Sequence, residues 1–324
     1  MKRINPVKFI IFLVLCLVIF IILGLFVGKV NIPLSETLND RYADILRLRL
    51  LRIVLAIAAG AGLSLSGVIL QAILRNPLAE PYILGISSGA GFGAVIGLLF
   101  FYSYMSPSIL AFIGGILTIV LVSRLAKLDN RISPENMIIS GILVNAFFSS
   151  LMMFFISNIS SAKVHSVIWW LLGNLQVYKG MPVTIVTGAV IFGFFVTVFF
   201  SKDMNAMSLG EEEAMHLGVN IERVKKILLL IAALVTSVIV STCGIIGFVG
   251  LMIPHIVRRM LGPDHRSLVI GSFLMGGLFL LLCDIGSRLI LSGPSDIPIG
   301  VVTAFIGVPF FVYILRKSRK VYFK

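Results

Sequence analysis

The chain has 324 residues, of which 58% are hydrophobic and 13% are charged, and it carries a formal net charge of +13. A soluble globular protein has roughly 25% charged residues, so this composition excludes an ordinary soluble domain. The apolar residues come in long blocks, and a helix needs about 20 of them to cross a bilayer with its backbone groups bonded internally. The composition therefore predicts an all-α, polytopic membrane protein.

Ten apolar blocks predict about ten transmembrane helices within a single domain that covers residues 1–324. The blocks lie near 8–28, 53–73, 83–103, 107–126, 136–157, 181–201, 225–243, 246–261, 267–291 and 297–316. Block 246–261 is short and contains Pro254. The stretch 164–176 is too short to span, and its pair Trp169–Trp170 favours an interfacial or re-entrant helix.

The first block follows a basic N-terminal start, which also occurs in signal peptides. The block exceeds a typical signal-peptide apolar region and no small-residue cleavage site follows it cleanly, so we expect an uncleaved span. With the N-terminus in the cytoplasm, most of the 27 Lys and Arg fall on cytoplasmic segments. This agrees with the positive-inside rule and explains the basic charge by lipid rather than nucleic acid. Arg47, Arg49 and Arg52 fall outside, and the rule does not explain them.

Two of the predicted spans carry small residues at four-residue spacing, which lets helix backbones approach closely in lipid. They are Ala58, Gly62 and Ser66 in one span and Gly89, Gly93 and Gly97 in the next. Packing within one subunit is favoured over a dimer interface.

Neither of two common enzyme motifs supports a catalytic activity in this chain. The segment 85–89 matches G-x-S-x-G, but a nucleophile elbow needs a strand-to-helix turn, and here the motif opens a predicted span. An intramembrane hydrolase would need Ser87 and a histidine to converge. There is no G-x-x-x-x-G-K-[ST], so ATP-driven transport would require a separate ATPase chain.

Cysteine and histidine give no sign of a bound metal. The three cysteines fall inside apolar blocks without paired spacing, and the four histidines lie in different segments. We therefore expect no disulfide, no metal site and no cofactor.

Asp284 is the ionisable residue most clearly embedded in a predicted span, and Arg288 follows at the i+4 spacing at which helical side chains meet. A structural ion pair is favoured over a proton relay. A secondary carrier, the competing class of transporter, would depend on Asp284 and would usually show several embedded carboxylates.

The segment 202–224 predicts a short helix, a turn and a second helix on the cytoplasmic side. Ser208 and Glu211 form a capping-box pattern, Gly218 is placed as a C-terminal stop, and Asn220 can cap the next helix. Ala214, Met215 and Leu217 supply a small apolar face. From the residues alone, an ordered loop and a docking site for a cytoplasmic partner remain equally open.

Four long motifs resemble the FecCD-type permeases, the membrane subunits of ATP-binding-cassette (ABC) importers for iron–siderophores, haem and vitamin B12. The motifs are Arg49-Leu-Leu-Arg52 with GAGLSLSGVILQAILRNPLAEPYILGISSGAG (60–91), LGEEEAMHLGVNIERVK (209–225), GFVGLMIPHIVRRMLGPDHR (247–266) and 283–317. The resemblance covers nearly the whole chain and implies the type II ABC importer permease fold.

The resemblance also implies partners and a location. These are a second permease copy or sister subunit, two cytoplasmic ATPase subunits and an extracytoplasmic substrate-binding protein. The membrane is the plasma membrane of a prokaryote, with both termini cytoplasmic and the translocation path between the two permeases.

Site residues follow from the matching positions. The resemblance implies that Arg49, Arg52 and Arg288 dock the binding protein, and that Asn76 and Leu78 form a cytoplasmic gate. The residues that it implies for ATPase coupling are Ser208, Gly210, Glu211, Ala214, Leu217 and Gly218. The stretch 133–135 departs from the gate pattern of the B12 importer, so no gate role is carried over to it. An iron–siderophore is the expected cargo; haem and corrinoids remain open, as does a homodimer versus a heterodimer.

Overall fold

The computed structural model describes residues 4–28, 40–101, 105–128, 131–158, 161–290 and 297–322. The helices are α1 (Pro6–Phe26), α2 (Asp40–Ile73), α3 (Ile86–Phe100), α4 (Ser106–Leu125), α5 (Pro134–Ser157), α6 (Ser161–Leu171), α7 (Gly180–Phe199), α8 (Ser201–Met207), α9 (Glu211–His216), α10 (Ile221–Cys243), α11 (Val249–Leu261), α12 (His265–Ile290) and α13 (Ile299–Tyr322). Two short strands, β1 (Lys127–Leu128) and β2 (Arg131–Ile132), pair antiparallel.

Each of the ten predicted spans lies on a helix: α1–α5, α7 and α10–α13. Within the described ranges, seven helices are long and apolar enough to cross a membrane. Helix α3 (Ile86–Phe100) and the apolar part of α13 (Ile299–Ile314) are shorter. α11 has 13 residues and contains Pro254. The stretch around Trp169 forms the separate short helix α6, as its length predicted. The all-α membrane fold is confirmed, with one small hairpin added.

Local sequence signals explain where several helices begin. Asn5 precedes Pro6, and its Oδ1 accepts a hydrogen bond from the Val7 amide at 3.0 Å. Ser133 precedes Pro134 in the same way at α5, and its Oγ accepts from the Asn136 amide at 3.4 Å. Such caps satisfy amides that lack a partner in the first helical turn, and proline is tolerated there because it has no amide to satisfy.

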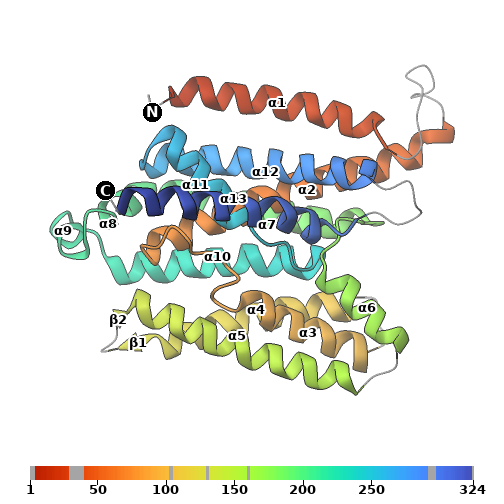
Figure 1. Ribbon diagram of the computed structural model, residues 1–324, viewed down its shortest axis with the longest axis horizontal. Coiled ribbons are helices and arrows are strands. Elements are labelled where there is room, and N and C mark those ends of the chain that lie inside the picture. Colours follow the sequence, from red (N-terminus) through yellow and green to blue (C-terminus); the bar gives the residue numbers. More distant parts are fainter. Residues whose placement is uncertain are drawn as a thin grey trace.

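α2 is the central helix of the bundle, and α1 lies at its edge (Figure 1). In the α2 span 89% of the residues are buried, against 22% in the α1 span. α2 packs against α12, α11, α10 and α7, while α3, α4 and α5 form a second group on the far side of α10. α10 contacts both α2 and α4 and so joins the two groups.

Glycines bring several helix backbones into direct contact. A Cβ on Gly60 would lie 2.2 Å from the carbonyl oxygen of Gly276, and one on Gly67 would lie 1.9 Å from that of Gly250. A Cβ on Gly93 would lie 2.1 Å from the Leu110 carbonyl oxygen, so the small-residue face of α3 packs on α4. The predicted small-residue face of α2 packs on α7 and α10. A Cβ on Gly62 would meet Val190 and Val235. Ser66 Oγ donates to the Ala232 carbonyl at 3.4 Å. Both small-residue faces therefore pack within this subunit.

The two chain ends lie at the same end of the bundle, together with α8, α9 and the β1–β2 hairpin (Figure 1). We call this the terminal end. α6 lies at the opposite end (Figure 1). The Ile4 amide donates a hydrogen bond to the Met260 carbonyl at 3.2 Å, which fixes the start of the chain beside the end of α11.

Candidate functional site

A charged cluster joins α2 to α12 near the opposite end of the bundle. The carboxylate of Asp284 is fully buried and accepts hydrogen bonds from two arginines. Arg52 Nε donates to Oδ1 at 2.7 Å, and Arg288 Nε donates to Oδ2 at 3.0 Å. Arg288 Nη2 also donates to Oδ2. The i,i+4 ion pair expected from the sequence is therefore present, and Arg52 joins it from a second helix.

Arg288 of this cluster and the nearby Arg49 also hold the end of α1. Arg49 Nη1 donates to the carbonyl oxygens of Leu25 at 2.8 Å and Phe26 at 3.2 Å. Arg288 Nη1 donates to the carbonyl oxygen of Gly24 at 3.3 Å. The last carbonyls of a helix lack partners within it and carry the negative end of its dipole, so guanidinium groups stabilise them. The arginines thus fasten α1, α2 and α12 together.

The three arginines expected to dock a binding protein lie together, as a docking site would require, but they expose little surface. Arg49 is 9% and Arg288 is 7% exposed, and the side chain of Arg52 is 15% exposed. The neighbouring Arg47 is exposed. Of the three, Arg52 offers the largest surface to a partner. The docking role stays a prediction.

The two residues expected to form a gate lie in a turn that follows α2. Arg75 has a positive φ of 48°, which ends the helix. Asn76 Oδ1 then accepts from the Leu78 amide at 2.9 Å, and its carbonyl accepts from the Ala79 amide at 3.0 Å. This Asx turn holds the Leu78 side chain outward, where it is 40% exposed.

Within the segment 202–224, the predicted short helix is α9 and the predicted second helix is the start of α10. Gly218 has a positive φ of 83° and ends α9. Its amide donates to the Met215 carbonyl at 2.9 Å, and the Val219 amide donates to the Ala214 carbonyl at 3.0 Å, the paired bonds of a Schellman motif. Asn220 Oδ1 accepts from the Arg223 amide at 3.1 Å and caps α10. Gly218 and Asn220 therefore act as predicted.

The predicted capping box between Ser208 and Glu211 is wrong. Ser208 Oγ donates to the Met204 carbonyl at 2.9 Å, so it bonds back to α8, not forward to α9. The N-cap of α9 is Gly210, whose φ of 140° suits glycine. Serine hydroxyls often bond to the carbonyl four residues earlier, and here that local bond outcompetes the cap.

The apolar face predicted for α9 is divided. Ala214 is fully buried, whereas Leu209, Met215 and Leu217 are 70%, 51% and 65% exposed. All three lie on or directly beside α9, at the terminal end of the bundle (Figure 1). We call these three residues the α9 patch.

A buried lysine next to α9 was not singled out by sequence reasoning. Lys225 on α10 is 1% exposed. Its Nζ lies 3.0 Å from Glu211 Oε1 and 3.6 Å from Glu222 Oε1, and it donates to the Ile132 carbonyl at 3.1 Å. A signal was available, because position 225 shares the apolar helical face of Val224 and Leu228. A lysine on such a face needs partners.

A carboxyl group with a buried oxygen was also missed. Glu80 lies in the connection between α2 and α3, and within the described part of the chain its Oε2 has no hydrogen-bond partner. Burial raises the pKa of this carboxyl to about 7. The residue lies two positions after Leu78 in the turn, so a group that titrates near neutral pH adjoins the predicted gate.

The remaining candidates contribute little. Ser133 Oγ donates to Glu135 Oε2 at 2.8 Å, which completes the start of α5. Ser87 lies in the first turn of α3, after a turn and not after a strand, so the geometry of a nucleophile elbow is missing. Among the described residues, no group of three or more His, Cys, Asp or Glu could hold a metal ion.

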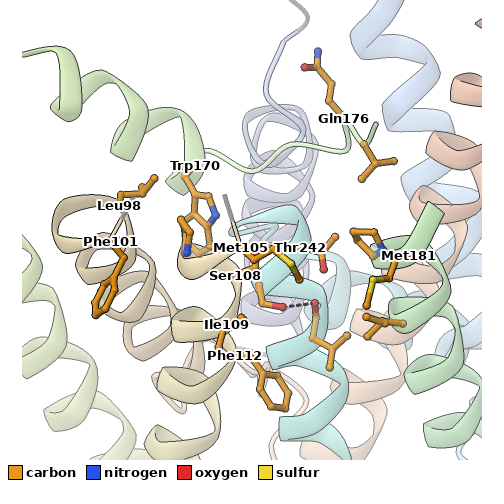
Figure 2. A pocket seen from close by; sticks show the side chains of 16 residues that line it. Leu98, Phe101, Met105, Ser108, Ile109, Phe112, Trp170, Gln176, Met181 and Thr242 are labelled. Atoms are coloured by element: carbon orange, nitrogen blue, oxygen red, sulfur yellow. Dashed lines mark hydrogen bonds between the residues drawn. The ribbon is translucent and has the colours of Figure 1, made fainter. Parts of the chain in front are cut away.

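An apolar cavity of about 830 Å³ lies between α3 and α4 on one side and α7 and α10 on the other, near the end of the bundle where α6 lies (Figure 2). Trp170, Phe101 and Met105 are among the residues that line it, with Ser241, Thr242 and Gln176 as polar members. Among the residues that the structure describes, no charged residue or histidine lines it, and none of the predicted site residues does.

The comparisons with known proteins decide the family. The chain matches the FecCD transport family over residues 16–317. It belongs to that family. The Fe(3+) dicitrate transport system permease protein FecD of Escherichia coli is 34% identical over 321 residues, covering 97% of this chain and 99% of FecD. The cobalamin import system permease protein BtuC of Halobacterium salinarum is 38% identical over 276 residues, covering 83% of this chain and 72% of that protein.

A solved structure gives the same answer for this FecCD permease. It is described as an inward-facing conformation of a metal-chelate type ABC transporter, and it matches with a TM-score of 0.87 and 30% identity over 97% of this chain and all of that chain. The chain is therefore the permease of an ABC importer for metal chelates, a non-catalytic membrane subunit. Such a permease works in a complex with ATPase and binding-protein partners.

Proposed function

We propose that this chain forms half of a permease dimer that imports an iron–siderophore by alternating access, driven by two ATPase subunits. The family and the ferric dicitrate relative support iron as the cargo. The cobalamin permease relative supports a corrinoid as the second candidate. A hemin permease relative supports haem as a third within the same importer type. The chain acts as one transmembrane domain over residues 1–324.

The observation that carries the coupling role is the α9 patch. Leu209, Met215 and Leu217 are exposed on and beside a six-residue helix at the terminal end, where apolar side chains would not face lipid. A permease without a P-loop needs an ATPase, and this patch supplies an apolar docking surface for one. We place the terminal end, with both termini, in the cytoplasm of a prokaryotic plasma membrane.

A single substitution tests the patch. Leu217→Asp places a charge on a side chain that is 65% exposed, so the fold has no reason to change. We expect the ATPase no longer to co-purify with the permease. Tyr178→Asp, at a residue that is 71% exposed beyond α6, is the matched control. Equal co-purification of both variants would refute the coupling role of the patch.

Transport itself is tested with the complete complex in proteoliposomes, loaded with binding protein and a labelled cargo. We expect ATP-dependent uptake of a ferric siderophore, with haem and cobalamin as the comparison cargoes. Uptake of cobalamin or haem alone would replace the siderophore assignment. Uptake that needs a proton gradient and no ATPase would refute the importer mechanism and favour a carrier that depends on Asp284.

The proposed outer docking site is Arg49, Arg52 and Arg288, and its test should spare the fold. Reversing all three charges would leave Asp284 buried without partners, so loss of uptake would not be specific. Arg52→Gln keeps a donor near Asp284 and removes the charge with the most exposed surface. We expect weaker binding of the binding protein with the permease–ATPase complex intact. Arg47→Gln is the control, and equal effects of both would contradict the site.

The proposed inner gate is Asn76 with Leu78, which projects from the turn after α2. In the dimer the two exposed Leu78 side chains would meet and close the path. This places the gate two residues from Glu80 and beside the coupling segment.

A further inference from the structure

Lys225 makes contacts that connect three separate parts of the terminal end. Its ammonium group has three hydrogens to donate. It lies 3.0 Å from Glu211 Oε1 of α9 and 3.1 Å from the Ile132 carbonyl of β2. Glu222 Oε1, on its own helix, lies 3.6 Å away. One buried side chain therefore holds the coupling helix, the β1–β2 hairpin and the start of α10.

The contacts continue from α9 into the predicted gate. Glu211 Oε1 also lies 3.4 Å from Arg75 Nη2. Arg75 directly precedes Asn76 and Leu78, so the carboxylate that Lys225 binds also binds the gate turn. This second pair is partly exposed, with 45% of the Arg75 side chain and 33% of the Glu211 side chain accessible, and is the weaker of the two.

The contacts on the other side continue into α5. Glu222 Oε2 accepts a hydrogen bond from the Ile132 amide at 3.3 Å, while Lys225 binds the Ile132 carbonyl. Ile132 directly precedes Ser133, the N-cap of α5. Both backbone groups of this residue are thus tied to α10, and a shift of α10 must displace the start of α5.

The four charges balance, because Lys225 and Arg75 face Glu211 and Glu222. Separating Lys225 from Glu211 would leave a buried ammonium short of partners, and breaking a buried pair is strongly destabilising. α9 is therefore held to α10, β2 and the gate turn while it moves. The buried ammonium favours concerted displacement of these segments over independent movement.

We propose that Lys225 is a positioning residue that transmits displacement of α9 to the gate turn and to the start of α5. The proposal rests on the proposed function of α9 as the ATPase-coupling helix. It gives Lys225 no contact with cargo or ATP. Its effect is on how much cargo moves per ATP hydrolysed.

The test compares four variants in the full permease–ATPase complex. Lys225→Met keeps length and removes the charge, Lys225→Arg keeps the charge, and Glu211→Gln removes the partner. Lys226→Met is the matched control, since Lys226 is the exposed neighbour on the same helix. In proteoliposomes we expect Lys225→Met and Glu211→Gln to lower cargo moved per ATP by roughly tenfold, within the usual range of coupling between sites. Lys225→Arg should recover most of it, and ATPase co-purification should persist in the Lys225 and Lys226 variants.

A second readout requires no cargo. Spin labels at Pro77→Cys and Glu212→Cys report the distance between the gate turn and α9 with and without ATP. Both positions are exposed, and neither belongs to the proposed gate pair or to the α9 patch. We expect a distance that stays fixed during turnover in the wild type and varies in Lys225→Met. Absence of chelate uptake by the wild type would refute the proposed function but not this distance result. A Lys225→Met that behaves like Lys226→Met, or that misfolds while Glu211→Gln stays fully coupled, would overturn the proposal.

Discussion

At the scale of single residues, Asp284 joins two helices through buried ion pairs. It is fully buried and binds Arg52 and Arg288, while Arg288 and the adjacent Arg49 bind carbonyls of α1. An ionisable group inside a membrane protein is costly unless it is paired, and is then either structural or functional. The geometry gives Asp284 a structural role, which agrees with the structural ion pair that its i+4 spacing to Arg288 favoured.

We therefore expect Asp284→Asn to destabilise the permease. Removing the carboxylate charge leaves buried guanidinium groups facing one another, and breaking a buried pair costs about 3–5 kcal/mol. The melting temperature of the purified protein in detergent should fall well below that of the wild type. Asp44→Asn, at an exposed residue of α2, is the matched control and should have little effect. Equal melting temperatures for the two variants would show that the cluster contributes little.

Glu80 predicts a dependence of stability on pH. Its pKa in the folded protein is about 7 against an ordinary value of 4.5, so the folded state binds more protons than the unfolded state between these values. Stability contributed by this group is therefore lost as pH rises from about 4.5 through 7. We expect Glu80→Gln to lose this component. Melting temperatures measured at about pH 5 and pH 8 should differ less for Glu80→Gln than for the wild type. An equal difference in melting temperature for the two proteins would show that the pKa of Glu80 lies near its ordinary value.

At the scale of single elements, α9 is a helix of six residues whose stability depends on the contacts at its C-terminal end. Short helices are marginal by themselves, so the Schellman bonds around Gly218 and the contact from Lys225 must hold it. Gly218 has a positive φ of 83°, and a Cβ there would meet nothing within 4 Å. Alanine at this position would thus introduce backbone strain without a clash.

Gly218→Ala should loosen α9 while leaving the bundle intact. The left-handed conformation costs a residue with a Cβ about 1–2 kcal/mol. We expect amide hydrogen exchange in α9 to become about 5- to 30-fold faster, the factor that this energy represents. Gly188→Ala is the matched control, since its Cβ also meets nothing within 4 Å and its backbone is helical. Unchanged exchange in α9 would show that its end does not limit its opening.

The sequence predicts elements well where the signal is local. The long apolar blocks give the ten helices, and Gly218 and Asn220 act at the positions that their chemistry suggests. The error at Ser208 is also local, because its hydroxyl can accept from an amide of α9 or donate to the Met204 carbonyl, and only the fold decides between them. The mixed exposure of the α9 apolar face could not be predicted, since it depends on what packs against a helix of under two turns.

At the scale of the whole molecule, the arrangement predicts a definite topology. α9 lies at the terminal end, and Tyr178 follows α6, which lies at the opposite end (Figure 1). In right-side-out vesicles we expect a membrane-impermeant maleimide to label Tyr178→Cys but not Leu217→Cys, and the reverse in inverted vesicles. Of the native cysteines, Cys243 and Cys283 are buried, and Cys16 is partly buried within α1, so the unsubstituted protein gives the background labelling. Labelling of both new cysteines from one side would contradict the topology.

Contacts between distant segments are what the sequence does not reveal. Lys225 and Ile132 are 93 positions apart, and Arg52 and Asp284 are 232 apart. No periodicity links such pairs, because side-chain patterns report only which face of a helix is buried. The family resemblance supplied roles for Arg49, Arg52 and Arg288, but only the structure shows that they also bind the end of α1 and a buried carboxylate.

The glycine contacts of α2 have a mechanical consequence. At Gly60 and Gly67 its backbone rests directly on those of α12 and α11, with no layer of side chains between them to deform. From Arg52 to Ile73 the helix rises 1.5 Å per residue, about 30 Å in all, which is the thickness of the hydrocarbon core. The arginines of the proposed docking site and the turn of the proposed gate thus lie at the two ends of one stiff helix. A displacement at one end of α2 is therefore transmitted to its other end, with no side-chain layer to absorb it.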